Sequence, residues 1–242
     1  MPLIFLDKIS STNDYLKDLL SKGLLKDNTF VVAADQTEGR GQMGNNWLAH
    51  KGSSISLSVY KKHLNLSLED QFKIAMSVSL AVRQVLALFS EELSVKWPND
   101  ILIKGKKVGG ILIENKIQGN LVTSSVIGIG LNILKFPMPE LTQATALSEH
   151  SKVSIKLGHL IEILVIQLDK SLSEIDHLPY LSLKFRYENK LFGYGLLKTF
   201  QRPNKNSFQG TIRGITSNGA LVIEDHAGLK EFFQFKEVKM IL

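Results

Sequence analysis

Two strand-like segments of this chain carry glycines where a strand normally carries side chains. In residues 127–132 (Ile-Gly-Ile-Gly-Leu-Asn), Gly128, Gly130 and Asn132 alternate with apolar residues. Successive residues of a strand point to opposite faces of a sheet, so the glycines and the asparagine share one face while the apolar residues fill the other. The smooth face suits a flat ligand with a polar edge, and it suits close packing against a helix equally well.

The second segment, residues 107–114 (Lys-Val-Gly-Gly-Ile-Leu-Ile-Glu), places Gly109 and Gly110 side by side inside an otherwise good strand. Glycine weakens a strand, and adjacent glycines usually mark a bulge or a close approach by another group. We therefore expect this strand, like the first, to leave part of its backbone open to a neighbour.

The remaining apolar pattern predicts a mixture of helices and strands. Apolar residues recur with helical spacing over 70–89 and 155–172, and a shorter amphipathic stretch follows residues 10–13 and ends at Gly23. Strands are expected over 3–6, 29–37, 54–60, 95–103 and 122–133, with a hairpin over 101–114 that turns at 104–105.

After about residue 190 the pattern changes to short apolar runs separated by turn signals, of which Asn218-Gly219 is the strongest. So short a stretch of strands predicts a small barrel that is marginal alone and docks on a larger domain. We therefore expect an α+β domain over residues 1–190 and a small β domain over residues 191–242.

Composition limits the class of protein. The 242 residues are 44% hydrophobic and 21% charged, which is typical of a globular chain. No apolar run approaches the roughly 20 residues that span a bilayer, and no secretory signal opens the chain. We expect a cytoplasmic protein that does not enter a membrane. The absence of cysteine excludes a thiol nucleophile and a cysteine-ligated metal.

The net charge of +6 indicates an anionic partner. No acidic residue lies between Glu38 and Glu69, whereas Arg40, Lys51 and the lysines at 61–62 fall inside that gap. The sequence has no block of five or more basic residues and no basic stripe with interleaved aromatics. This distribution favours a local anion site over a track for nucleic acid.

Residues 39–44 (Gly-Arg-Gly-Gln-Met-Gly) match the letters of the dinucleotide-binding loop G-x-G-x-x-G. That loop requires a following helix and an acidic residue about 20 positions later, and the sequence offers neither. What remains is a loop whose backbone can wrap an anion beside the fixed charge of Arg40. A plain surface loop explains these residues at least as well.

Two further polar segments each allow a structural and a functional interpretation. Residues 10–13 (Ser-Ser-Thr-Asn) suit a helix cap, with Asp14 three positions after Ser11, and a helix N-terminus also offers N–H groups to a polar ligand. In residues 96–100 (Lys-Trp-Pro-Asn-Asp), Pro98 interrupts a strand and leaves a cation and a carboxylate at its end. A loop with a satisfied ion pair explains the second segment about as well as a functional site.

The order and wording of these motifs resemble one family. The series is Ser-Ser-Thr-Asn (10–13), Asp-Gln-Thr leading into Gly-Arg-Gly (35–41), Lys-Trp-Pro-Asn-Asp (96–100), Lys-Val-Gly-Gly (107–110) and Gly-Ile-Gly-Leu-Asn (128–132). Together these segments resemble the biotin protein ligase family from about residue 7 to residue 132. The C-terminal part, including 212–215 and 219–221, is more weakly similar to the small SH3-like domain of that family.

The resemblance implies an α+β fold, shared with class II aminoacyl-tRNA synthetases, with a mixed and largely antiparallel sheet and a small C-terminal SH3-like β-barrel. It also implies two reactions at one site. Biotin and ATP, with Mg²⁺, give biotinyl-5'-AMP and pyrophosphate, and a lysine of a biotin carboxyl carrier domain then takes the biotinyl group. No covalent enzyme intermediate is required, which suits a chain without cysteine. The resemblance is also compatible with a homodimer.

By position in the family motifs, the resemblance assigns five residues to biotin. Ser11, Thr12 and Gln36 would bind the ureido end, and Gly109 and Gly110 would lie beneath the rings.

The resemblance assigns the reacting groups to the other end of the site. Arg40 and Lys107 would bracket the carboxylate and the α-phosphate, and with Asp100 they are the expected catalytic residues. Trp47 would cover the adenine, while Asn132 and Asp100 would support the nucleotide, Mg²⁺ or the incoming amine. The other expected substrate contacts are Asn13, Gly39, Gly41, Gln42, Lys96 and Asn99.

The sequence departs from the family pattern in three places. Members that double as repressors carry a DNA-binding domain ahead of the ligase, whereas here the first motif begins at Ser10, so we expect a form without that domain and no DNA binding. Gln42 stands where many members have a second loop arginine, which predicts weaker retention of the adenylate. Residues 236–238 (Lys-Glu-Val) replace a common Gly-Glu-Val.

Two alternative functions remain at this point. A lipoate–protein ligase is related in fold but lacks this wording of the glycine-rich loop. A basic nucleic-acid-binding protein without catalysis is the alternative from another class.

Overall fold

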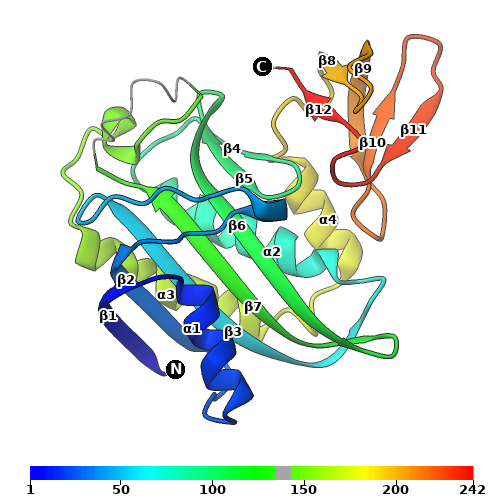
Figure 1. Cartoon of the computed structure of the whole chain (residues 1–242). Coiled ribbons are helices and arrows are strands. Elements are labelled where there is room, and N and C mark those ends of the chain that lie inside the picture. The colour runs from blue at the N-terminus through cyan, green and yellow to red at the C-terminus, as the bar shows by residue number, and fades with distance from the viewer. Residues whose placement is uncertain (135–142, 242) are drawn as a thin grey trace.

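The computed structural model describes residues 1–134 and 143–241, which form an α+β fold with one seven-stranded and one five-stranded sheet (Figure 1). The larger sheet has the strand order β1-β2-β3-β7-β6-β5-β4. Its first pair is parallel and its other neighbouring pairs are antiparallel. The strands are β1 (Leu3–Ile9), β2 (Thr29–Gln36), β3 (Ser54–Ser67), β4 (Leu93–Lys96), β5 (Asp100–Ile103), β6 (Lys106–Gln118) and β7 (Leu121–Asn132).

Helices cover the two faces of the larger sheet unequally. Helices α2 (Phe72–Leu86) and α3 (Leu157–Ser173) lie together on one face, and α4 (Tyr180–Glu188) extends this layer toward the smaller sheet. On the other face, α1 (Thr12–Ser21) lies against β2, β3 and β7. Two short 3₁₀ turns occupy Gln42–Gly44 and Leu147–His150. Part of the α1 face therefore stays uncovered by helices.

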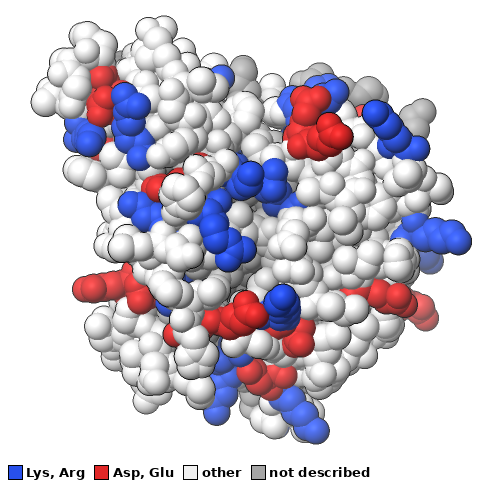
Figure 2. Space-filling model, turned by 180° about the vertical axis from the view of Figure 1, so that it is seen from behind, with Lys and Arg blue, Asp and Glu red and all other residues white. Residues whose placement is uncertain are grey.

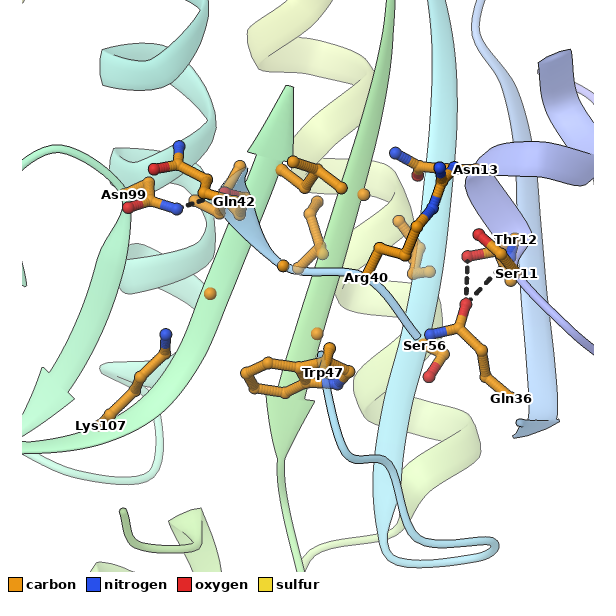
Figure 3. A pocket seen from close by; sticks show the side chains of 18 residues that line it. Ser11, Thr12, Asn13, Gln36, Arg40, Gln42, Trp47, Ser56, Asn99 and Lys107 are labelled. Carbon is orange, nitrogen blue, oxygen red and sulfur yellow. Dashed lines mark hydrogen bonds between the residues drawn. The ribbon is translucent and has the colours of Figure 1, made fainter. Parts of the chain in front are cut away.

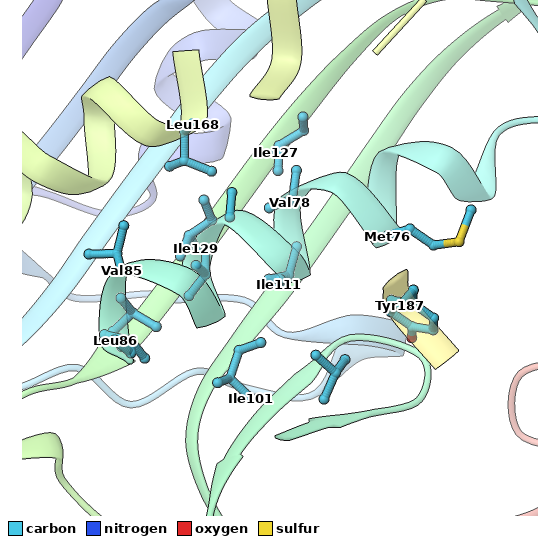
Figure 4. Packing of buried hydrophobic residues seen from close by; sticks show 14 of the residues in the cluster. Met76, Val78, Val85, Leu86, Ile101, Ile111, Ile127, Ile129, Leu168 and Tyr187 are labelled. Atoms are coloured by element: carbon cyan, nitrogen blue, oxygen red, sulfur yellow. The ribbon is translucent and has the colours of Figure 1, made fainter. Parts of the chain in front are cut away.

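The main core lies between the larger sheet and the α2–α3 layer. Ile127 and Ile129 of β7 pack with Val78 and Val85 of α2 and with Leu168 of α3 (Figure 4). Each such side chain contributes about 1.5–3 kcal/mol when it is fully buried. The alternation predicted for residues 127–132 is confirmed, because the apolar positions enter this core and the glycines face the opposite side.

Helix α1 begins where the sequence predicts. The backbone N–H of Asp14 donates to Ser11 Oγ at 3.3 Å, so Ser11 caps the helix. Leu16 packs under the helix with Val31 and Tyr60 in a second, small apolar cluster. The polar first turn of α1 is thereby held at the edge of the uncovered sheet face.

The β4–β5–β6 region also follows the sequence. Strand β4 ends at Lys96 and β5 begins at Asp100, so the Trp97-Pro98 segment interrupts the strand as expected. The hairpin turns at Lys104 and Gly105, whose φ angles of 50° and 79° lie in the left-handed region.

Helix α4 was not predicted. Its inward residues, Leu183 and Tyr187, are 2% and 0% exposed, but Leu181 and Phe185 on its outer side are 76% and 66% exposed. Because apolar residues occupy both faces, the sequence shows no amphipathic period there.

The smaller sheet has the order β11-β10-β9-β8-β12, with antiparallel neighbours. The predicted turn at Asn218-Gly219 joins β9 to β10. Within the described residues the edge strands β11 and β12 do not pair, so the sheet is open and the predicted closed barrel is not confirmed. The strands are β8 (Leu197–Gln201), β9 (Ser207–Ile215), β10 (Leu221–Glu224), β11 (Lys230–Phe233) and β12 (Lys239–Met240).

Specific hydrogen bonds dock the smaller sheet on the larger unit. The indole N–H of Trp97 donates to the carbonyl of Gly219 at 2.8 Å, and the Tyr180 hydroxyl donates to the carbonyl of Thr216 at 2.7 Å. The backbone N–H of Ile215 donates to Glu188 at 2.8 Å. The expected docking of a C-terminal β unit is thus present, and it places β12 beside the β4–β5 loop.

Charges of both signs are interspersed in small groups on the face seen in Figure 2.

In the described part of the chain, no helix combines the length and apolar character needed to cross a membrane.

A buried histidine makes stability depend on pH. The side chain of His63 is 0% exposed, with Nε2 2.9 Å from Ser125 Oγ and Nδ1 3.6 Å from Asp176. Burial lowers the pKa of His63 below its ordinary 6.5; the nearby Asp176 and Asp27 carboxylates oppose this shift, and Lys61 adds to it. As the pH falls below 6.5, the unfolded chain therefore binds a proton that the folded chain does not bind.

We expect the free energy of unfolding to decrease as the pH falls below 6.5, until the folded pKa of His63 is reached. Replacement of His63 by glutamine should flatten this dependence. Urea unfolding of both proteins from about pH 7 to about pH 5 measures the difference. Parallel pH profiles would show that His63 does not carry the effect.

Candidate active site

A pocket of about 50 Å³ opens on the sheet face that α1 partly covers (Figure 3). It gathers residues from the start of α1, the end of β2, the glycine-rich loop, the β4–β5 loop and the start of β6. Eleven of the predicted site residues line it: Ser11, Thr12, Asn13, Gln36, Arg40, Gly41, Gln42, Trp47, Asn99, Lys107 and Gly110. Segments far apart in the sequence therefore meet at one place, as the motifs predict.

Glycines form the floor of this pocket. A side chain at Gly128 would come within 2.5 Å of Asn13 Oδ1, and one at Gly130 would overlap the indole of Trp47. A side chain at Gly110 would meet the Lys107 ammonium at 3.3 Å. Only glycine lets these groups approach the sheet so closely.

Hydrogen-bonding side chains occupy the end of the pocket near α1. The Thr12 backbone N–H lies 2.9 Å, and its hydroxyl oxygen 3.0 Å, from Gln36 Oε1. Ser58 Oγ lies 2.7 Å from Thr12 Oγ1 and 2.6 Å from Asn13 Oδ1. The Asn13 amide in turn donates to Glu114 at 2.7 Å. This end can exchange several hydrogen bonds with a polar ring.

A cation lies across the pocket from α1. Lys107 Nζ is 2.6 Å from Asp100 Oδ1 and 5.7 Å from the centre of the Trp47 ring. Arg40, by contrast, forms an ion pair with Asp14 of α1. Figure 3 shows Arg40 and Lys107 on opposite sides of the pocket. The two cations predicted to bracket one reacting group thus line one pocket but are not adjacent.

A second cavity, of about 360 Å³, lies between the glycine-rich loop, the β4–β5 loop and the smaller sheet. It shares Gln42, Trp47 and Lys107 with the first pocket, and Phe192 and Phe235 supply apolar walls. Its volume is in the range of small-molecule sites.

Positive charge dominates the polar side of this second cavity. Among its described lining residues, Lys96, Lys107 and Lys239 accompany the single carboxylate of Asp100. Burial lowers the pKa of Lys96, the Lys239 and Lys107 ammonium groups lower it further, and Asp100 opposes the shift. An anion at this place would relieve the repulsion between the lysines.

Three predicted contacts, Gly39, Gly109 and Asn132, lie outside the lining of both cavities. Gly109 follows the strand alternation and faces Leu131, whereas Gly110 faces the pocket. Asn132 is 5% exposed, and its Oδ1 has no partner among the described residues.

The sequence reasoning missed three polar residues around the first pocket. Ser56 lines the pocket, while Ser58 and Glu114 hold the groups near α1. The alternation of Ser54, Ser56 and Ser58 on β3 was the available signal, because serines at every second position mark one polar face.

In the part of the chain that the structure describes, no three His, Cys, Asp or Glu side chains cluster to hold a metal ion. The Asp100 carboxylate, the predicted magnesium ligand, forms an ion pair with the Lys107 ammonium at 2.6 Å. The donor set does not fit a metal site built from protein alone.

The position of Trp47 leads to a measurable prediction. Its indole lies on the glycine floor, so a ligand whose rings take that floor must displace it. We expect such a ligand to change the tryptophan fluorescence. The change should persist in Trp97→Phe and disappear in Trp47→Phe, because these are the two tryptophans of the chain. A signal carried by Trp97 would show that the indole of Trp47 stays in place.

The fold and the pocket define a class of protein: an α+β protein with a glycine-floored site that has a hydrogen-bonding end and a cationic end. The sequence profile of the biotin/lipoate A/B protein ligase family matches residues 5–132. The chain belongs to this family.

Relatives match over most of the chain. The bifunctional ligase/repressor BirA of Bacillus spizizenii is 31% identical over 236 residues, which cover 96% of this chain and 72% of that protein. The biotin–[acetyl-CoA-carboxylase] ligase of Mycobacterium tuberculosis is 27% identical over 233 residues, which cover 90% of this chain and 83% of that protein.

The solved structure of the biotin protein ligase of Aquifex aeolicus, in complex with biotin and ATP, has the same fold. It superposes with a TM-score of 0.79 at 24% identity and covers 99% of this chain and 98% of that one. Both the larger α+β unit and the smaller sheet are therefore included in the likeness.

Proposed function

We propose that this protein is a biotin–protein ligase, which forms biotinyl-5'-AMP from biotin and ATP and transfers the biotinyl group to a protein lysine. The observation that carries the proposal is the glycine floor between a hydrogen-bonding end at Thr12 and Gln36 and a cationic end at Lys107. Biotin has the matching form: a fused bicycle with a polar ureido ring at one end, and an aliphatic chain that ends in a carboxylate. Relatives named biotin ligases support the assignment.

Each substrate is assigned to one cavity, and biotin must displace the Trp47 indole to enter the first. The ureido ring is placed against Ser11, Thr12 and Gln36, with the chain running over Gly128 and Gly130 toward Lys107. ATP is placed in the second cavity, with its phosphates beside Lys96 and Lys107 and its base near Trp47. The carboxylate and the α-phosphate then meet where the cavities join.

Lys107 would stabilise the negative charge that builds on the phosphate oxygens as the carboxylate attacks and pyrophosphate leaves. Asp100 holds the Lys107 ammonium in place. Magnesium would enter the site with ATP, since Mg²⁺ usually binds through substrate phosphates with few protein ligands.

The acceptor proposed is a lysine of a biotin carboxyl carrier domain. The names of the relatives from M. tuberculosis and Paracoccus denitrificans include acetyl-CoA-carboxylase as the protein modified. We also propose residues 1–190 as the catalytic domain and 191–242 as a small domain related to SH3 folds, in which the docked sheet walls the nucleotide cavity through Phe235 and Lys239.

Transfer of the biotinyl group to a carrier domain tests the proposed function. Purified protein, Mg-ATP and biotin should add one biotinyl group to one lysine of a biotin carboxyl carrier domain, as read by mass spectrometry. A carrier variant with that lysine replaced by arginine is the matched control. Transfer of lipoate but not biotin would contradict the proposal.

A substitution at Gln42 is expected to change the rate at which the adenylate is released. Its side chain lines both cavities, and its Oε1 is buried without a partner among the described residues. Arginine at this position would add a charge-assisted bond to phosphate, which is roughly twice as strong as a neutral one. An extra ~1 kcal/mol corresponds to about a fivefold slower release of the adenylate from Gln42→Arg. Equal dissociation rates for wild type and variant would place Gln42 outside the phosphate contacts.

A further inference from the structure

A separate cavity of about 300 Å³ lies between helices α2, α3 and α4. These helices cover the side of the larger sheet opposite α1 and the glycine floor (Figure 1). The cavity shares no lining residue with either substrate cavity. Its apolar walls are Leu80, Ala81, Leu178 and Leu183, and the other lining side chains are polar or charged. A cavity of this size and polarity suits a small hydrophilic molecule.

Ser77 gives this cavity a buried polar group without a partner. The residue lines the cavity from α2 and is 3% exposed, and its Oγ has no hydrogen bond among the described residues. A buried hydroxyl left unpaired destabilises the fold, and such groups normally find a partner. A polar ligand in the cavity would supply one.

Two cations line the same cavity from different helices. Lys170 lies in the last turn of α3 and Arg186 lies on α4. Within the described part of the chain, neither side chain forms an ion pair or a hydrogen bond. Together with the Ser77 hydroxyl, these side chains can receive a carboxylate.

The cavity also contains an unpaired carboxylate. Glu174 is the C-cap residue of α3, and its side chain has no partner among the described residues, although Lys170 lies one turn earlier. The C-terminal end of a helix carries partial negative charge, so a carboxylate is unfavourable there and a cation is favourable. An ammonium group of a ligand would therefore be attracted by both Glu174 and the end of α3.

Amide side chains occupy another part of the lining. Gln167 Nε2 lies 3.3 Å from Gln84 Oε1 and 3.3 Å from Ser171 Oγ. Both distances are longer than those of a good N–H···O bond. These amides can exchange such weak contacts for hydrogen bonds to the polar end of a ligand side chain.

We propose that this cavity binds a free polar α-amino acid. The carboxylate of the ligand would lie at Lys170, Arg186 and Ser77, and its ammonium group at Glu174. A zwitterion satisfies the unpaired charges of both signs, whereas a simple anion leaves Glu174 unpaired and a simple cation leaves the two basic residues unpaired. The inference is independent of the biotin ligase activity, because the substrate cavities have separate linings.

L-glutamine is the probe, and two analogues separate its charges. 4-Carbamoylbutanoate lacks the ammonium group and 4-aminobutanamide lacks the carboxylate, while both keep the side-chain amide. In NMR titrations of the full chain, glutamine should saturate and shift the backbone amides of Lys170, Glu174 and Arg186. Each analogue should bind roughly threefold to fivefold more weakly, as expected for partly exposed charge pairs. The same saturation should be seen with biotin and Mg-ATP present.

Three variants assign the contacts, and a fourth is the control. Glu174→Gln should weaken glutamine roughly threefold to fivefold but leave 4-carbamoylbutanoate unchanged, and Lys170→Met should weaken glutamine but leave 4-aminobutanamide unchanged. Ser77→Ala should weaken glutamine and yet raise the urea midpoint of the free protein, because it removes an unpaired buried hydroxyl. Glu162→Gln, on the exposed side of α3 and outside the cavity, should bind normally.

Three results would overturn the site: no saturable shifts with glutamine, shifts confined to other parts of the chain, or equal changes for all three probes in Glu174→Gln and Lys170→Met. A lower urea midpoint for Ser77→Ala would also contradict it, since the hydroxyl would then have a structural partner. None of these results bears on biotin-dependent activity, which is measured separately.

Discussion

Replacement of Lys107 by alanine is expected to slow adenylation by roughly 10²–10³-fold, the cost of removing one preorganised charge-stabilising donor. Lys107 is the cation at the junction of the two cavities, and Asp100 fixes it at 2.6 Å. Because its charge acts mainly on the transition state, kcat should fall much more than the affinity for biotin. Single-turnover formation of biotinyl-5'-AMP measures this loss.

The neighbouring lysine is the matched control. Lys106 has the same charge and lies on the same strand, but it is exposed and does not line either cavity. Lys106→Ala should adenylate biotin at the wild-type rate. Comparable rates for the two variants would show that Lys107 acts only as a residue of the hairpin.

Replacement of Gly130 by alanine is expected to raise the KM for biotin by about 10- to 100-fold. An added Cβ would project into the pocket where the Trp47 indole now lies and would deny that space to a ligand ring. Overpacking of this kind costs about 1–3 kcal/mol, and each 1.4 kcal/mol is a tenfold change. The KM for ATP should change much less, since Gly130 does not line the second cavity.

Gly158→Ala is the control for this substitution. Gly158 lies in the first turn of α3, and a Cβ there meets nothing within 4 Å. Alanine should even favour the helix slightly. An unchanged KM for biotin in Gly130→Ala would remove the glycine floor from the binding site.

Much of the fold could be predicted because local signals agreed with the tertiary structure. Period-two alternation in 127–132 placed the isoleucines in the core and the glycines on the open face. The Ser11 cap and the turn at 104–105 could be predicted for the same reason, since each depends only on residues nearby in the sequence. Helix α4 was not predicted because Leu181 and Phe185 are apolar but exposed, which hides the amphipathic period. The smaller sheet was predicted as a closed barrel but is open, because pairing of its edge strands is a long-range property that no local pattern encodes.

The site could be predicted as a set of motifs but not as a geometry. The sequence gives no sign that Arg40 would pair with Asp14 instead of standing beside Lys107, because that contact depends on how the loop folds back on α1. Glu114 was equally hidden, since its hydrogen bond from Asn13 joins residues 101 positions apart. Lys239 enters the second cavity only because the smaller sheet docks beside the β4–β5 loop.

Pyrophosphate exchange tests the central claim most directly, because it isolates adenylation from the choice of acceptor protein. With Mg-ATP and labelled pyrophosphate, the purified protein should incorporate label into ATP when biotin is present and should not do so without it. Lipoate should not replace biotin. Exchange supported by lipoate and not by biotin, or exchange independent of both, would contradict the account.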